Sequence, residues 1–179
     1  KQAAIAGDVK IEIEPIDSCD FNPNDLKKYQ GIIAPQGWGS RGVEGIIKAI
    51  KVARENNIPY LGLCFGMQMA VVEFARNVLK LKGANSAEVD PKTKYPVIHI
   101  MPDQAEYLKK KQYGGTIRLG SWPCKLAKKT KLAEAYKKYG QDKQAPWNIE
   151  DNFKTKDKTD VVFERHRHLE ALEVVDADG

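Results

Sequence analysis

Apolar residues in the first half of the chain recur at two different spacings. Residues 9–14 alternate apolar and charged side chains, a period of two that is typical of a half-buried strand or an edge strand. Short apolar runs at 31–34 and 59–63 are followed by glycine-containing turns, so we predict two buried strands there. Residues 43–53 and 65–79 instead place apolar side chains three or four positions apart. That spacing predicts one helix after each of the two buried strands.

The predicted elements alternate strand, helix, strand, helix, and this order indicates the fold class. Parallel strands need helical crossovers, so the order predicts an α/β three-layer sandwich with a mostly parallel central sheet. Further strand-like runs occur at 95–98, 115–119, 161–163 and 172–175. Residues 137–160 are mostly polar or charged with few apolar side chains, so we expect an exposed insertion or loop.

Length and composition narrow the class of protein. The chain has 179 residues, of which 42% are hydrophobic and 30% charged, and no apolar run is long enough to cross a bilayer. We expect residues 1–179 to form a single domain, an interior fragment of a longer cytoplasmic protein with no membrane partner. The three cysteines, Cys19, Cys64 and Cys124, have wide and unrelated spacings. They predict neither a disulfide framework nor a metal site.

The whole chain has a net charge of +5, and many of its lysines lie in the second half. They are Lys109, Lys110, Lys111, Lys125, Lys128, Lys129, Lys131, Lys137 and Lys138. Clustered lysines can bind nucleic acid by releasing counterions from its phosphates. The alternative, a solvated helix face beside a lysine-rich loop, is favoured because no zinc-finger spacing or aromatic RNA-binding strand accompanies them. We therefore predict no nucleic-acid partner.

The segment around Cys64 holds the candidate chemistry. In Gly62-Leu63-Cys64-Phe65-Gly66 the cysteine lies between two glycines, where the predicted strand meets the predicted helix. Such a tight turn is a nucleophile elbow, which presents a side chain clear of the sheet. The N–H groups and dipole of the helix favour a thiolate and can stabilise an oxyanion. The alternative is that Cys64 is simply a small buried residue, but the flanking glycines favour a nucleophile.

A second glycine turn, Pro35-Gln36-Gly37-Trp38-Gly39, follows the predicted strand at 31–34. The carboxyl ends of neighbouring parallel strands open onto the same crevice, so both turns are expected to face one ligand. The N–H of Gly37 would there complete an oxyanion hole with the N–H of Phe65. Cys19 and Cys124 lie outside both turns and are predicted to be structural.

With both turns placed, the sequence resembles the class I glutamine amidotransferase domain of the CTP synthase family. The matching segments are 35–45, 53–68, 73–78, 83–88, 114–120 and 164–168. The resemblance implies the flavodoxin-like fold of those amidotransferases and hydrolysis of L-glutamine to glutamate and ammonia through a thioester on Cys64. The ammonia would convert UTP to CTP on an N-terminal synthetase domain, normally in the same chain.

The resemblance also implies which residues bind glutamine. Six residues in and near the two turns would contact it: Gly37, Phe65, Gly66, Met67, Gln68 and Glu88. Gly37 and Phe65 would hold the oxyanion, whereas the Glu88 carboxylate would meet the α-ammonium group of the substrate. Without the resemblance, Glu88 would be interpreted as a surface acid in the turn at residues 85–86.

Residues in the second half of the chain are implied to lie near ligands. His166, Arg167 and His168 would lie near the substrate, the alternative being polar residues at a strand edge. Arg118 belongs to a segment that the family associates with its response to GTP. No metal site and no cofactor are predicted in this domain. ATP, Mg²⁺ and the GTP effector are expected for the full enzyme, which is expected to be a homo-oligomer.

The sequence departs from the family pattern at the general base. The family takes its base and the acid that orients it from a C-terminal His-Pro-Glu segment, which this sequence lacks. Leu169 stands where the family has an arginine that contacts glutamine. Gln36 replaces a glycine at the first position of the oxyanion turn, and we expect its side chain to distort that turn. Around residues 7–8 and 168–169, segments that are separated in the family follow each other directly. We therefore expect that intervening residues are missing from the sequence at these two places.

Two other interpretations follow from these departures. A γ-glutamyl hydrolase, or the amidotransferase of another synthetase, would use the same scaffold and the same nucleophile. A regulatory or interaction module that has lost its His/Glu pair would keep the fold with impaired catalysis. Selective alkylation of Cys64 by a glutamine-like ketone distinguishes an active site from such a module, because an inactive module would not recognise the reagent.

Overall fold

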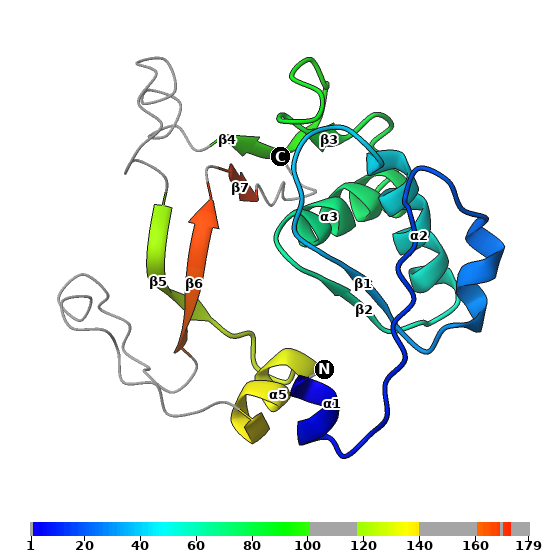
Figure 1. Cartoon of the computed structure of the whole chain (residues 1–179). Helices are drawn as coiled ribbons and strands as arrows, with labels where there is room; N and C mark the ends of the chain where they lie inside the picture. The colour runs from blue at the N-terminus through cyan, green and yellow to red at the C-terminus, as the bar shows by residue number, and fades with distance from the viewer. Residues whose placement is uncertain (1, 101–117, 140–160, 169, 173–179) are drawn as a thin grey trace, which may run out of the picture. The chain divides into compact units, whose positions relative to one another are not determined.

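The computed structural model describes residues 2–100, 118–139, 161–168 and 170–172 (Figure 1). Contacts divide the chain into two compact units, the first of residues 1–100 and 171–179 and the second of residues 101–170. The first unit contains both glycine turns, and the second contains Arg118 and the basic segment 164–168. Among the helices described, none combines the length and the hydropathy that crossing a bilayer requires.

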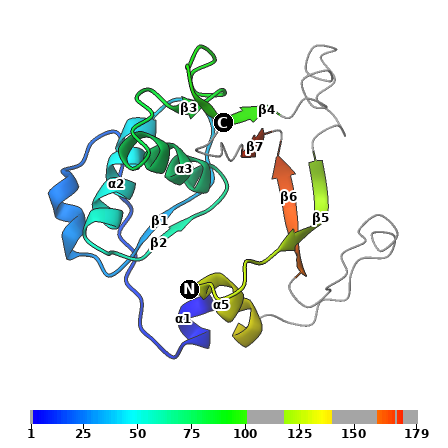
Figure 2. The ribbon, with the colours of Figure 1, turned by 180° about the vertical axis from the view of Figure 1, so that it is seen from behind.

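Two parallel strands joined by a helical crossover lie at the centre of the first unit. β1 (Ile32–Ala34) pairs in parallel with β2 (Tyr60–Gly62). α2 (Val43–Glu55) connects the two strands, and α3 (Phe65–Asn77) follows β2 (Figure 2). The predicted order of strand, helix, strand and helix is confirmed, and with it the α/β class.

Shorter elements complete the first unit. An α-helix, α1 (Gln2–Ala6), and a 3-10 helix, η1 (Pro23–Lys28), precede β1. A second sheet has the strand order β3 (Asn85–Ser86), β4 (Pro96–Ile100) and β7 (Glu170–Leu172), with β3 and β4 parallel. The strand predicted at 95–98 is thus confirmed as β4. Of the strand predicted at 172–175, only residue 172 lies within the described residues.

Helices α2 and α3 pack against each other. The core residues that they contribute are Val43, Ile47, Ile50, Phe65, Met69, Val72 and Ala75. The apolar spacing predicted the buried face correctly for α2, whereas for α3 the expected Phe74 and Val78 are exposed and Met69 and Val72 are buried instead. An ion pair also joins the helices, since the Arg54 guanidinium donates to both carboxylate oxygens of Glu73 at 2.8 to 3.2 Å. Glu73 is only 1% exposed. Because an unpaired buried carboxylate is costly, this pair helps to fix how the two helices face each other.

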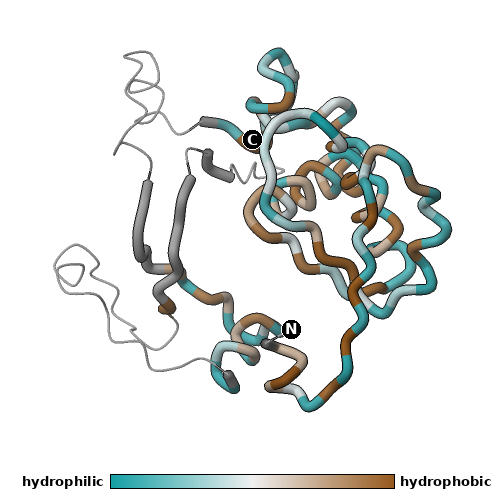
Figure 3. Tube along the Cα trace, in the orientation of Figure 1, coloured by the Kyte–Doolittle hydropathy of each residue, from teal (hydrophilic) through white to brown (hydrophobic). Residues whose placement is uncertain are grey.

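The alternating segment 9–14 does not form the predicted strand. Its residues belong to no ladder of the described structure, although hydropathy changes from residue to residue along this part of the chain (Figure 3). Val9, Ile11 and Ile13 are exposed. The prediction was wrong because alternation expresses only a local preference. A strand is stabilised by its ladder of hydrogen bonds and by side-chain packing against a neighbour.

An antiparallel pair of strands lies in the second unit. β5 (Arg118–Lys125) pairs with β6 (Val161–His168), and the register begins with Arg118 opposite His168. Strand structure predicted at 118–119 and 161–163 is confirmed and extends further than expected. Residues 115–117 of the first of these predictions lie outside the described residues.

A helix occupies the start of the region predicted to be a loop. α5 (Lys131–Tyr139) contains residues 137–139, so the prediction was wrong there, whereas 140–160 lie outside the described residues. The hydroxyl of Thr130 accepts a hydrogen bond from the N–H of Ala133 at 3.2 Å, which caps the helix. In this helix Ala133 and Tyr136, three positions apart, are half-buried, whereas the lysines and Leu132 are exposed.

Candidate active site

Cys64 lies at the sharp turn between β2 and α3. Its backbone has φ 54° and ψ −106°, a conformation that non-glycine residues rarely adopt. On one side, the N–H of Leu63 donates to the carbonyl oxygen of Ala34 at 2.9 Å. On the other side, the N–H groups of Met67 and Gln68 donate to the Cys64 carbonyl at 3.0 and 3.1 Å. These bonds hold the strained turn, with the half-buried Cys64 side chain at its tip.

Close backbone contacts require both glycines of the turn. A Cβ atom at Gly62 would lie 2.6 Å from the backbone of Gly66 and Met67. A Cβ atom at Gly66 would overlap the carbonyl oxygen of Ala34 and lie 2.8 Å from the Cβ of the same residue. The first turn of α3 therefore rests directly on the carboxyl end of β1, where the second glycine turn begins.

The glycine turn after β1 lies against the start of α3. A Cβ atom at Gly37 would lie 3.5 Å from Cδ1 of the Phe65 ring. Gly66, Met67 and Gln68 use their N–H groups within the elbow. Within the described residues, neither Gly37 nor Phe65 donates its backbone N–H to a protein acceptor. Two backbone donors, one directly after Cys64 and one in the turn that lies against the Phe65 ring, are therefore not used by the described residues.

Gln36 is accommodated in this turn without backbone strain. The left-handed residues of segment 35–42 are Gly39, with φ 77°, and Gly42, with φ 74°. Gln36 has a negative φ, which any L-residue adopts, so the conformation does not depend on a glycine at that position.

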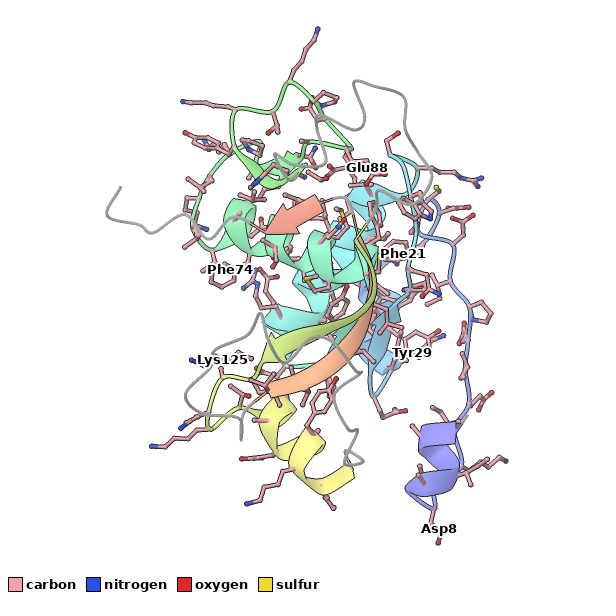
Figure 4. The ribbon with its side chains drawn as sticks, turned by 90° about the vertical axis from the view of Figure 1, so that its left-hand side faces the viewer. Asp8, Phe21, Tyr29, Phe74, Glu88 and Lys125 are labelled. Atoms are coloured by element: carbon pink, nitrogen blue, oxygen red, sulfur yellow. The ribbon has the colours of Figure 1, made fainter. Side chains whose placement is uncertain are left out.

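Glu88 is held against the same turn. Its Oε1 atom accepts a hydrogen bond from the N–H of Gly39 at 3.1 Å. Its own N–H donates to the hydroxyl of Ser86, a fully buried residue, at 3.2 Å. Glu88 follows β3 and is half-buried (Figure 4). The fold thus brings a carboxylate from another segment to the turn that contains Gly37.

Gln68 is buried one helical turn after Cys64. The residue is 5% exposed, and its Oε1 atom accepts no hydrogen bond within the described residues. An amide oxygen without a donor is costly in a protein interior, so it suits an N–H group supplied by a ligand. Of the three residues between them, Phe65 and Gly66 are buried and Met67 is half-buried.

Tyr60 supports the elbow from β2, although the sequence analysis did not single it out. Its hydroxyl donates a hydrogen bond to the carbonyl oxygen of Gly66 at 2.7 Å. Burial raises the pKa of Tyr60 to about 12. A tyrosine at the end of a strand is ordinary, so nothing in its sequence position indicated this contact.

Replacing Tyr60 with phenylalanine should alter how stability depends on alkaline pH. The native pKa is about 12 and the ordinary value is 10.0. Between these two pH values the native protein keeps the Tyr60 hydroxyl proton, whereas the unfolded chain has lost it. The free energy of unfolding is therefore at its full value below pH 10.0 and falls as the pH rises to about 12. The Tyr60→Phe variant lacks this titration, and its free energy of unfolding should fall less over that range. Denaturant titrations measure this, and parallel pH profiles of the two proteins would contradict it.

The other candidate residues lie in the second unit. Arg118 is the register partner of His168, while Arg167 and His166 stand opposite Leu119 and Gly120. The antiparallel pairing thus aligns two motifs that are far apart in the sequence. Leu169, where the sequence departs from the family pattern, lies outside the described residues. Among the residues that are described, no group of three or more His, Cys, Asp or Glu side chains could hold a metal ion.

Comparisons with known proteins agree with this geometry. Residues 1–173 match the model of the family "Glutamine amidotransferase class-I". The CTP synthases of Pyrococcus abyssi and Bacillus subtilis are each 45% identical to this chain over 94% of its length, and the chain spans 27% and 28% of theirs. The solved glutaminase domain of Trypanosoma brucei CTPS with bound acivicin has a TM-score of 0.72 and 31% identity, covering 94% of this chain and 58% of that one. The chain therefore belongs to the class-I glutamine amidotransferase family and has its flavodoxin-like α/β fold.

Proposed function

We propose that this chain is the glutamine-hydrolysing part of a CTP synthase. The Cys64 sulfur attacks the side-chain amide carbon of L-glutamine, and the N–H groups of Gly37 and Phe65 hold the oxygen that becomes negatively charged. The carbon–nitrogen bond breaks, the thiol proton ends on the departing ammonia, and a γ-glutamyl thioester remains on Cys64. Water then hydrolyses the thioester, which releases glutamate and restores the thiol.

The observation that carries this proposal is the elbow itself. A strained, half-buried cysteine precedes one backbone donor, that of Phe65, and the Gly37 donor belongs to the turn against the Phe65 ring; no protein group engages either donor within the described residues. A cysteine buried only for packing would need neither the strained φ nor the two donors. Oxyanion holes are built from such backbone donors, positioned before the reaction begins.

Two nearby polar groups fit the amino-acid end of the substrate. The half-buried carboxylate of Glu88 suits an α-ammonium group, and the buried Oε1 atom of Gln68 can accept a further N–H. Gly66 and Met67 supply the wall between Cys64 and Gln68. Together these groups select an amino acid whose side-chain amide reaches Cys64.

The ammonia is proposed to react outside this chain. The chain spans only about a quarter of the CTP synthases that it matches, 27% of the Pyrococcus abyssi protein. We assign UTP, ATP and Mg²⁺ to an N-terminal synthetase domain of a cytoplasmic, homo-oligomeric enzyme. Arg118 would take part in the response to GTP. His166, Arg167 and His168 would lie near the substrate without acting as the base.

A diazoketone analogue of glutamine should alkylate Cys64 selectively. Cys19 is exposed and Cys64 is half-buried, so a reagent governed only by access, such as iodoacetamide, should favour Cys19. A reagent that the glutamine site recognises should reverse that order, and L-glutamine but not D-glutamine should protect Cys64. Peptide mass spectrometry measures both. Equal or greater labelling of Cys19, or no protection, would indicate a module with impaired catalysis.

A second measurement separates CTP synthase from other amidotransferases on this scaffold. Ammonia released from glutamine by the full chain should increase when UTP and ATP are bound. A γ-glutamyl hydrolase, or the partner of a different synthetase, would release its product at a rate that UTP does not change.

A further inference from the structure

Arg76, in the last turn of α3, bridges two segments that lead into the site. Its Nη1 donates to both carboxylate oxygens of Glu44 at 2.8 and 3.1 Å. Its Nε donates to the carbonyl oxygen of Ala84 at 2.5 Å. The Arg76 side chain is only 18% exposed, and Ala84 is completely buried. Contacts of this kind, from a charged donor, are among the stronger hydrogen bonds in proteins.

The two partners of Arg76, Glu44 and Ala84, each lie at one end of a segment that contributes to the site. Glu44 lies in the first turn of α2, directly after the segment 35–42 that contains the Gly37 donor. Ala84 directly precedes β3, which leads to Glu88. At their other ends the same two segments meet through the hydrogen bond from Gly39 to Glu88 at 3.1 Å. The two segments are therefore joined twice, once at the site and once through Arg76.

We propose that Arg76 is a positioning residue for glutamine binding. It holds the segment with the oxyanion donor and the segment with the α-ammonium-binding carboxylate at a fixed spacing. This inference rests on the proposed glutaminase function. Arg76 does not itself touch the substrate, and it acts through Ala84 and Glu44.

Loss of this bridge should affect substrate binding more than the chemical step. Cys64 and the Phe65 donor are held by the elbow, whose bonds to Ala34 and within α3 do not involve Arg76. The Gly37 turn lies against the Phe65 ring, so its donor stays at the elbow when the bridge is lost. Without Arg76, the segment that ends at Glu88 is held less firmly. The Glu88 carboxylate would then be correctly placed for the α-ammonium group of glutamine for a smaller fraction of the time. We therefore expect KM for glutamine to rise and kcat to change little.

The test uses the full chain with the variants Arg76→Gln, Arg76→Lys and Glu44→Gln. Arg76→Gln should raise KM for glutamine about tenfold and change kcat less than about threefold. Lysine keeps a positive charge opposite Glu44, but its donors lie on a single nitrogen and cannot hold both partners as a guanidinium does. Arg76→Lys should therefore raise KM less than Arg76→Gln does. The apparent affinity of the glutamine-like diazoketone for Cys64 should weaken in parallel, while its limiting rate of alkylation stays near that of the wild type.

Arg54 offers a matched control. It also joins α2 to α3 through an ion pair, with Glu73, but within the described residues neither side chain forms a hydrogen bond or ion pair with the segments 35–42 and 84–88. Arg54→Gln should lower the melting temperature at least as much as Arg76→Gln and leave KM within about twofold of wild type. If the two variants change KM equally, or if Arg76→Gln leaves KM unchanged, the positioning role is wrong.

The remaining outcomes are also decisive. If Arg76→Gln fails to fold, the Glu44→Gln variant provides the test, because Glu44 is exposed and substitutions at exposed positions usually change stability little. An unchanged KM in that variant would overturn the proposal. If wild-type protein neither hydrolyses glutamine nor reacts at Cys64, the proposed function fails and the positioning role fails with it. An active wild type with insensitive Arg76 variants would remove the positioning role alone.

Discussion

Replacement of Cys64 with alanine or with serine should abolish glutamine hydrolysis and preserve the fold. Alanine removes the sulfur, and serine places a hydroxyl there that is far less ionised than a thiol, so no thioester can form. We expect ammonia release from glutamine to fall by at least about a thousandfold in both variants. Either residue meets the same backbone strain at φ 54° as cysteine does, so the melting temperature should change little.

External ammonia provides the control for this prediction. If Cys64 serves only to release ammonia, the full enzyme with Cys64→Ala should still aminate its second substrate when ammonium chloride is supplied. Cys19→Ala should keep glutamine hydrolysis near the wild-type rate, because Cys19 lies outside the elbow. A Cys64→Ser variant that retained a tenth of the activity, or a Cys19→Ala variant that lost it, would show that the nucleophile is assigned wrongly.

The elbow could be predicted from sequence because its causes are local. Gly62 and Gly66 flank Cys64 within five residues, and the apolar spacing before and after them defines a strand and a helix. The turn containing Gly37 follows its own strand in the same way. The rule that parallel strands share a carboxyl edge then placed both turns together, as the hydrogen bond from Leu63 to Ala34 shows.

Contacts between distant segments could not be predicted in this way. Nothing near Glu88 indicates that its carboxylate accepts a hydrogen bond from Gly39, 49 residues earlier. The Arg76 bridge has the same character, since its partners lie on α2 and before β3. The prediction of a strand at 9–14 was wrong for a related reason. The alternation of apolar and charged residues is a local pattern, whereas a strand also needs a neighbouring strand from elsewhere in the chain. Patterns in sequence thus predicted the elbow at Cys64 better than the contacts of the polar groups that would orient a substrate.

Replacing Gly66 with alanine should destabilise the protein strongly and impair catalysis. Helix propensity alone predicts the reverse, because alanine in a helix is favoured over glycine by about 1 kcal/mol. Here the added methyl group would overlap the carbonyl oxygen of Ala34, an atom of the β1 backbone that also accepts the hydrogen bond from Leu63. We expect the free energy of unfolding to fall by more than about 3 kcal/mol. Glutamine hydrolysis should fall about a hundredfold in the fraction that stays folded, because the elbow is displaced.

Gly31→Ala tests whether the effect arises from the close contact rather than from the loss of a glycine. A Cβ atom at Gly31 would lie 3.6 Å from the carbonyl oxygen of Pro59, an ordinary van der Waals distance, and its φ is not in the left-handed region. The free energy of unfolding of Gly31→Ala should lie within about 0.5 kcal/mol of the wild-type value, because the native contacts are kept and the unfolded chain is less flexible. Denaturant unfolding of both variants measures the contrast. Equal stabilities would mean that α3 can move away from β1, and the rigid elbow on which the oxyanion donors depend would then have no structural basis.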